Sequence, residues 1–280
     1  MLTLCMMVKD EESSLARCLD SVAGLATELI VVDTGSTDAT PQIAAQYGAR
    51  VLPFDFARID FAAARNHALD HATGRWILVL DADETLHSES RARVEALVLS
   101  QGDTGYYLER HNHSNRTTRD YVVRLFPNRP EYRYRGRVHE TVDASILAAG
   151  GRLHQTAIRI EHNFAIDPAA RRRKNLRYIE ILKEELAADP TDDSRLDFLA
   201  AEYHQLELFG EASLITEHIA AVRPLDARAQ LFAGVYHLLY KPDLAKARAD
   251  FHRALQLRPD YSEAVSFLQL AEGVSLAEPR

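Results

Sequence analysis

The chain has 280 residues, 46% hydrophobic and 26% charged, the composition of a folded globular protein large enough for two domains. Its formal net charge of −8 argues against nucleic acid as the main partner, because such binding needs a positive field to displace counterions from phosphates. Every apolar run is too short to cross a bilayer and the first segment lacks signal-peptide features, so we expect no transmembrane segment and a cytoplasmic location.

Short apolar runs alternate with amphipathic stretches over the first hundred residues. The expected strands are residues 2–8, 29–32, 51–52 and 76–80. The expected helices between them are residues 13–23, 41–47 and 60–72. This alternation is typical of a parallel sheet that is covered by helices on both faces.

The pattern becomes β-rich after residue 105, with turn signals between the apolar stretches. The stretches that read as β structure are residues 106–108, 121–126, 132–138 and 158–160. They indicate an antiparallel extension of the same domain. Between the first two, the polar residues 110–119, with His111 and His113, are expected to form a loop that can close over an acceptor.

From Asp167-Pro168 onward the chain reads as helix after helix. Three prolines, Pro190, Pro224 and Pro259, fall 34 and 35 residues apart, in phase with small residues, as in tetratricopeptide repeats. We expect the last helix of a degenerate repeat at 168–190, repeats at 194–224 and 228–259, and a closing helix at 260–275. A generic helical bundle is the alternative. The predicted domains are therefore 1–165, α/β, and 166–280, an all-α helical-repeat domain.

Three carboxylates, Asp81, Asp83 and Glu84, directly follow the strand expected at 76–80. A strand that ends this way places them at the carboxyl edge of the sheet, where open α/β folds bind ligands. Carboxylates this close repel one another, and a hard cation such as Mg²⁺ or Mn²⁺, shared with phosphate oxygens, relieves the repulsion. The simpler interpretation is that Asp81 and Asp83 cap a following helix with Glu84 in its first turn.

A second carboxylate, Asp33, ends the strand expected at 29–32 and is followed by the turn Thr34-Gly-Ser-Thr-Asp38. Two neighbouring strands that each end in an aspartate suggest one shared crevice, in which Asp33 can hold hydroxyls or a base. An ordinary capped turn explains the Ser/Thr residues equally well. The chain contains neither a P-loop nor the Gly-x-Gly-x-x-Gly dinucleotide fingerprint.

A series of segments in a fixed order resembles the motifs of family 2 glycosyltransferases of the GT-A type. These segments are residues 7–12 (MVKDEE), 17–21 (RCLDS), 30–38 (IVVDTGSTD), 64–66 (ARN) and 76–84 (WILVLDADE). Two later ones, 124–128 (RLFPN) and 136–140 (GRVHE), are similar to a subgroup in which tetratricopeptide repeats follow the enzyme domain. One departure is Asp10, where asparagine is more usual.

The resemblance implies a Rossmann-like GT-A domain that binds a UDP- or GDP-sugar and transfers the sugar with inversion at the anomeric carbon. It also implies a Mn²⁺ or Mg²⁺ cofactor, which would stabilise the departing diphosphate as a Lewis acid. The residues it assigns to the nucleotide sugar are Glu11, Asp33, Arg65, Asp81, Ala82 and Asp83. For the metal, it assigns Asp83, with Asp81 near the ribose or the metal, and we add His162, whose neutral imidazole can complete the metal sphere.

Direct displacement needs one general base and no protein nucleophile. Glu140 is the first candidate for this base, with His139 beside it, and Glu84 is the second. The pair His139-Glu140 can also be an ordinary surface pair. Four nearby arginines form a local basic strip that could oppose an anionic donor, although most of them fit one solvated face of a strand: Arg129, Arg133, Arg135 and Arg137.

Two further functions compete with this prediction. The helical domain is expected to bind a peptide, protein or carrier acceptor, and it can instead be a binding module attached to a catalytically silent α/β domain. A sugar nucleotidyltransferase would share the α/β chemistry, but its glycine-rich, basic N-terminal loop is absent here.

Overall fold

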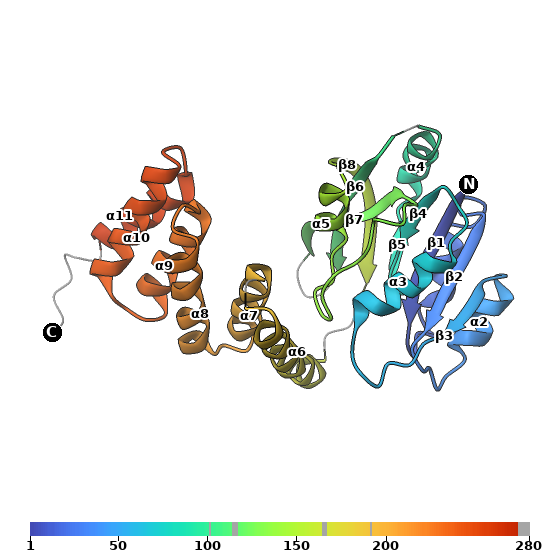
Figure 1. Ribbon diagram of the computed structural model, residues 1–280, viewed down its shortest axis with the longest axis horizontal. Coiled ribbons are helices and arrows are strands. Elements are labelled where there is room, and N and C mark those ends of the chain that lie inside the picture. The colour runs from blue at the N-terminus through green and yellow to red at the C-terminus, as the bar shows by residue number, and fades with distance from the viewer. Residues whose placement is uncertain (101, 114–116, 164–166, 191, 274–280) are drawn as a thin grey trace. The chain divides into compact units, whose positions relative to one another are not determined.

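The computed structural model describes residues 1–100, 102–113, 117–163, 167–190 and 192–273. The chain divides into two compact units, Met1–Ile166 and Asp167–Arg280, which are taken in turn below and are coloured blue to yellow and yellow to red in Figure 1.

The first unit is built on one mixed sheet, which has eight strands within the described residues. Their order across the sheet is β3-β2-β1-β4-β7-β6-β8-β5. The strands are β1 Leu2–Val8, β2 Glu28–Asp33, β3 Arg50–Pro53, β4 Trp76–Val79, β5 Glu84–Leu86, β6 Thr104–His113, β7 Thr117–Pro127 and β8 Arg152–Asn163. The first four run parallel, as the sequence predicts, and β7 joins β4 antiparallel.

Helices cover both faces of this sheet because side chains alternate along its buried strands. Their bounds are α1 Leu15–Ser21, α2 Thr40–Gln46, α3 Phe61–His71, α4 Arg91–Val98 and α5 Asp143–Ala148, with a 3₁₀ turn η1 at Ser88–Ser90. Leu4 and Met6 of β1 pack in one core with residues of α1, α2 and α4. Cys5, between them, packs in the other core with residues of α3 and α5.

The carboxyl ends of β1, β2 and β4 meet at one edge of the sheet because these strands are parallel. The chain leaves β4 through a short turn and enters β5, which begins at Glu84 and pairs antiparallel with β8. The interpretation of Asp81 and Asp83 as caps of a following helix is therefore wrong. The pairing of β5 with β8 places His162 directly opposite Glu84, and so beside the acidic turn.

Two expectations for the β-rich region are also wrong. Of the loop expected at residues 110–119, residues 110–113 and 117–119 instead form the outer part of the β6–β7 hairpin, in register from Arg110↔Asp120 to His113↔Thr117, and residues 114–116 lie outside the described residues. Residues 132–138 form no strand beyond a single bridge, Arg135↔Thr141. There the side chain of Asn66 replaces a neighbouring strand, since it accepts a hydrogen bond from the Tyr134 amide at 2.8 Å and donates one to its carbonyl at 3.0 Å.

The second unit consists of successive antiparallel-packed helices, which can be followed in Figure 1. They are α6 Pro168–Ala188, α7 Asp193–Gln205, α8 Phe209–Val222, α9 Ala227–Leu239, α10 Leu244–Leu257 and α11 Ser262–Gly273. Each contacts the next in the chain, which is the packing of a helical repeat. Four small or aromatic residues of these helices, Ala212, Ala247, Phe251 and Ala254, are completely buried.

Candidate functional site

The segments that follow β1 and β2 are tied together by side chains. Asp10 has a positive φ of 55° and accepts hydrogen bonds from the Thr37 amide at 2.7 Å and the Thr37 hydroxyl at 3.1 Å. An asparagine tolerates this left-handed conformation and offers the same acceptor oxygen, so Asp10 keeps the geometry of the usual residue. Asp33, at the end of β2, accepts a 2.6 Å bond from the Ser36 hydroxyl.

Glu11 lies in the same region, within the electrostatic field of the acidic turn after β4. Its amide donates to Thr40 Oγ1 at 2.7 Å. Burial raises the pKa of Glu11, the Ser14 hydroxyl opposes that rise, and the nearby charges of Asp83 and Asp81 add to it. The carboxylates after β1 and β4 therefore repel one another, and a cation between them would lower the energy of the site.

Two buried arginines hold the Asp81 carboxylate. Arg65 Nη2 contacts Asp81 Oδ1 at 2.8 Å, and Arg124 Nη2 contacts Asp81 Oδ2 at 2.6 Å. The side chains of both arginines are 7% exposed. Burial by itself would raise the pKa of Asp81, but the two guanidinium groups outweigh it and hold that pKa far below its usual range. Asp81 is thus an anion at any physiological pH.

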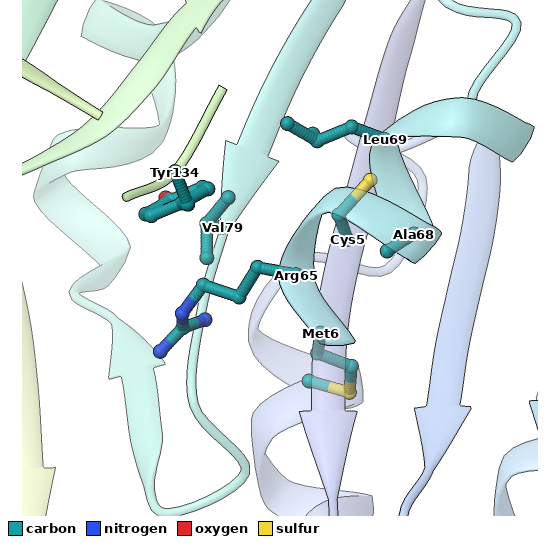
Figure 2. Close-up of a pocket in the computed structure, with 7 residues that line it drawn as sticks. All are labelled: Cys5, Met6, Arg65, Ala68, Leu69, Val79 and Tyr134. Atoms are coloured by element: carbon teal, nitrogen blue, oxygen red, sulfur yellow. The ribbon is translucent and has the colours of Figure 1, made fainter. Parts of the chain in front are cut away.

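Arg65 also reaches the candidate base. Its Nε donates to Glu140 Oε1 at 2.7 Å, so one guanidinium joins Asp81 and Glu140. In Figure 2 the Arg65 side chain extends from α3 toward Val79 and Tyr134. The centre of the Tyr134 ring lies 5.4 Å from the Arg65 Cζ. The space lined by these residues has no room for a water molecule, so the arginine is rigidly packed.

Glu140 and His139 belong to a tight loop that begins at Arg135. Two backbone hydrogen bonds between Arg135 and Thr141, of 2.9 and 3.1 Å, close this loop. His139 has a positive φ of 51°, a conformation that costs energy for a residue other than glycine and is concentrated at functional sites. The Glu140 side chain is 14% exposed and, among the described residues, its one hydrogen-bond partner is Arg65.

Glu84, the first residue of β5, stabilises the turn that carries Asp81 and Asp83. Its side chain has no exposed surface, accepts bonds from Arg124 at 2.9 Å and Arg110 at 3.4 Å, and receives the Asp81 amide at 3.0 Å. Arg110 in turn makes a two-pronged pair with Asp120, at 2.9 and 2.7 Å. The turn after β4 is therefore braced by charges from β5, β6 and β7.

Asp83 points to a different partner, His162 at the end of β8. Asp83 Oδ2 lies 3.1 Å from His162 Nε2, and the second ring nitrogen, Nδ1, lies 2.7 Å from Asn112 Oδ1. A carboxylate oxygen and an imidazole nitrogen that converge in this way fit a divalent cation that takes its remaining ligands from a diphosphate and water. No set of three or more metal-ligating side chains is found within the described ranges.

The family model for glycosyl transferase family 2 matches residues 3–162, which is more than half of the chain. The chain belongs to this family. A TPR repeat-containing protein of Synechococcus elongatus is 46% identical over 148 residues, covering 52% of this chain and 36% of that protein. The SPbeta prophage-derived glycosyltransferase SunS of Bacillus subtilis is 25% identical over 228 residues, covering 75% and 51% respectively.

Among solved structures, S. aureus TarS 1–349 in complex with UDP-GlcNAc has a TM-score of 0.54 at 14% identity and covers 98% of this chain and 91% of that one. This likeness shows the fold, a GT-A glycosyltransferase domain followed by a helical region. The chain spans between about a third and a half of the length of the curated relatives named above. None of the described helices is long and apolar enough to cross a membrane.

In this family 2 domain, Glu11 and Asp33 lie after β1 and β2, and Ala82 is buried in the turn after β4. Five other predicted residues form two groups of contacts. One group joins Arg65, Asp81 and Glu140, and the other joins Asp83 and His162. Asp81 points at arginines, and its place among the metal ligands stays a prediction.

Four residues at the centre of the site were missed: Arg110, Asn112, Asp120 and Arg124. Arg124 lies in the RLFPN segment, which was noted for its likeness but given no role. Arg110 and Asn112 lie in the stretch expected to form a loop, residues 110–119, and Asp120 follows it directly; the spacing of these three residues carries no visible signal in the sequence. Most of the basic strip is solvated, as expected: Arg135 is exposed and Arg129 pairs with Asp103 at the surface, whereas Arg137 is buried against the Ile59 carbonyl.

Proposed function

We propose that the chain is a metal-dependent, inverting glycosyltransferase that moves a sugar from a nucleotide-sugar donor to an acceptor. The observation that carries this proposal is the contact between Asp83 and His162 at the carboxyl edge of the family 2 sheet. Family membership supports the reaction class, and the two ligand types support the cation.

The Asp83 carboxylate and the His162 imidazole would hold the ion. When bound, it supplies Lewis-acid stabilisation of the departing diphosphate. A nitrogen ligand suits Mn²⁺ better than the harder Mg²⁺, so Mn²⁺ is the first choice. Asp81 stays bonded to its two arginines and fixes the turn that presents Asp83.

The nucleoside would lie against the segments after β1 and β2, with Asp33 and Glu11 as hydrogen-bond acceptors and Ala82 as a small residue beneath the ribose. A UDP-sugar is favoured over a GDP-sugar because the structurally similar TarS was solved with UDP-GlcNAc. Arg65 contributes indirectly, since its Nε already donates to Glu140 and its Nη2 to Asp81.

Glu140 is the proposed general base. Arg65 binds one of its oxygens, and the other, which has no hydrogen-bond partner among the described residues, would take the acceptor proton. The acceptor oxygen bonds to the anomeric carbon as the carbon–oxygen bond to the diphosphate breaks, so the configuration inverts. His139, the neighbouring residue, is a second candidate for proton transfer. Glu84 is too deeply buried to reach an acceptor.

A donor panel tests this proposal. Nucleotide release from UDP- and GDP-sugars would be measured with Mn²⁺, with Mg²⁺ and with a chelator. We expect release from at least one UDP-sugar that requires the metal and stops on chelation. The absence of binding and of release for every donor would refute the proposal and favour the binding-module alternative.

The helical unit is proposed to bind a peptide or protein acceptor. Helices α7, α8 and α9 line a cavity of about 440 Å³, whose wall includes His204, Phe232 and Tyr236. Phe232 is 43% exposed, although it is a large apolar side chain on a folded helix. Two of the aromatic residues in its wall are also held to each other, since His204 Nδ1 lies 2.9 Å from the Tyr236 hydroxyl.

Screening a displayed peptide library against the full chain tests this role. Peptides that bind should lose at least about tenfold in affinity for Phe232→Ala, because a central aromatic side chain is a typical anchor. The variant should release nucleotide from the donor at the unaltered rate when no acceptor is present. Leu225→Ala, which changes an exposed residue outside the cavity, is the control. Equal peptide binding by Phe232→Ala would contradict the assignment.

A further inference from the structure

The amino-terminal half of α6 carries a dense run of positive charge. Its residues 171–177 read RRRKNLR, and no acidic residue occurs between Asp167 and Glu180. Five of the 33 lysines and arginines of the chain fall within these seven residues, and all five are exposed: Arg171, Arg172, Arg173, Lys174 and Arg177. The surface of this half-helix is therefore strongly positive in a chain whose formal net charge is −8.

A single carboxylate offsets this charge within the described part of the chain. Arg177 pairs with Glu180 at 2.7 Å. Arg172 and Arg173 form no hydrogen bond or ion pair with any described residue. Arg173 and Arg177 lie four residues apart on the helix, a spacing at which like charges repel. The run thus weakens the helix when considered alone, and a negatively charged partner would offset the repulsion.

Two further cations of the run contact uncharged groups of the described residues. Arg171 donates to Gln205 Oε1 at 3.1 Å. The Lys174 ammonium lies 5.5 Å from the centre of the Tyr178 ring. Neither contact neutralises the positive charge, so both cations add to the field of the exposed side of α6.

An apolar side chain lies among the arginines. Leu176 is 43% exposed and follows Arg172 and Arg173 by four and three residues, so it is next to both on the helix surface. Asn175 and Ile179 of the same helix are buried, which identifies the side of α6 that packs on the unit. Leu176 lies off that side. We define the basic face of α6 as Arg172, Arg173, Leu176 and Arg177.

A bilayer with anionic phospholipids matches both properties of this face. Its surface presents phosphate oxygens, which pair with guanidinium groups, and hydrocarbon lies directly beneath them. Clusters of basic residues on a helix are attracted to such a surface. A nucleic acid would match the charges but offers no apolar layer for Leu176.

We propose that the basic face of α6 docks the chain on the surface of a membrane that contains anionic phospholipids. The three arginines bind lipid phosphates, and Leu176 enters the boundary between the headgroups and the hydrocarbon. The helix lies on the bilayer and does not cross it. This surface adds a location to the proposed glycosyltransferase and uses no residue of the donor or metal site.

Sedimentation of the full chain with lipid vesicles tests the proposal. Phosphatidylcholine vesicles with and without phosphatidylglycerol would be compared at low and at high salt. We expect binding to the vesicles with phosphatidylglycerol that weakens as salt rises, because salt screens exposed charges. Failure to bind these vesicles at low salt, or equal binding to phosphatidylcholine alone, would overturn the proposal.

A double variant, Arg172→Gln with Arg173→Gln, tests the placement on α6. Vesicle binding should weaken about 30-fold, since each basic residue near an anionic surface strengthens binding about fivefold. Lys246→Gln with Arg253→Gln removes the same charge from two exposed residues of α10 and should bind as the unsubstituted chain does. Equal weakening in the two double variants would show that net charge alone governs binding and would overturn the role of α6.

Leu176→Ser separates a membrane from a soluble polyanion or an acidic peptide. Loss of a buried leucine should weaken vesicle binding at least about tenfold. Binding to heparin, which offers charge without hydrocarbon, should not change. Unchanged vesicle binding by Leu176→Ser would overturn the membrane assignment. Circular dichroism verifies the fold of each variant. Nucleotide release without vesicles should stay unaltered, so the outcome is independent of the proposed donor chemistry.

Discussion

A single guanidinium group, that of Arg124, contacts two acidic residues, Asp81 in the turn after β4 and Glu84 at the start of β5. Its Nη2 lies 2.6 Å from Asp81 and 2.9 Å from the fully buried Glu84. Buried charges of this kind are costly unless each finds its counterion, because desolvation removes the stabilising contribution of water. Arg124 therefore belongs both to the stability of the first unit and to the geometry of the turn after β4.

Arg124→Met should lower the free energy of unfolding of the first unit by about 3–5 kcal/mol, because it removes one of the two arginine partners from each of the carboxylates Asp81 and Glu84. Urea unfolding followed by fluorescence measures this, since Trp76, the one tryptophan of the chain, is buried in β4. Arg124→Lys should retain part of the stability as a point charge. Arg152→Met, on an exposed arginine, is the control, and a change below about 1 kcal/mol in Arg124→Met would contradict the role.

Residue-level prediction from the sequence succeeded where a side chain follows a strand in the chain. Asp33, Asp81 and Asp83 could be placed at one sheet edge because parallel strands end together. The contacts of Arg124 and Asn112 could not be foreseen, since they come from cross-strand register and from partners as far as fifty residues away. Pairing across a sheet leaves no mark on the linear order of residues.

At the scale of elements, helices α9 and α10 approach each other closely through a glycine. A Cβ on Gly234 would lie 2.5 Å and 2.7 Å from atoms of the Phe251 ring, which is completely buried. At Gly210 of α8, by contrast, an added Cβ would have no atom within 4 Å. These two glycines therefore share a secondary structure and differ in packing.

Gly234→Ala should destabilise the helical unit by about 1–3 kcal/mol, because overpacking outweighs the gain in helix propensity. Gly210→Ala, the matched control, should stabilise it by up to about 1 kcal/mol. Circular dichroism reports the unfolding of this unit, which lacks tryptophan, while Trp76 fluorescence reports the other. Equal or greater stability of Gly234→Ala would show that α9 and α10 do not pack through this contact.

Strands and helices were predictable where their hydrophobic pattern was regular. Leu2–Val8 was placed without error, and the repeat helices follow the proline spacing. Residues 132–138 were predicted as a strand because tyrosines and arginines alternate there as they do along a half-buried strand. In the structure, hydrogen bonds from the Asn66 side chain hold the backbone of the buried Tyr134 instead. The hairpin beyond Arg110 was taken for a loop because its outer residues are polar on both faces.

At the scale of the whole molecule, the net charge of −8 is distributed in a way that composition alone does not reveal. At the carboxyl edge of the sheet, arginines that are buried or half-buried pair with the carboxylates of Asp81, Glu84, Asp120 and Glu140. These arginines are Arg65, Arg110 and Arg124. Asp83 differs, since its contact there is with the imidazole of His162 and its side chain is 28% exposed. Arginine side chains thus hold most carboxylates of the site in place, and in the proposed function a bound metal ion adds the positive charge beside Asp83.

The most direct test of that function is metal-supported nucleotide release from a UDP-sugar donor by the Asp83→Asn variant. The substitution keeps the size of the side chain and removes the charge that would hold the ion, so the rate should fall by at least about a hundredfold. Asp20→Asn, a surface change on α1, should release nucleotide at the rate of the unsubstituted chain. Release by Asp83→Asn at that same rate would contradict the metal site and, with it, the proposed mechanism.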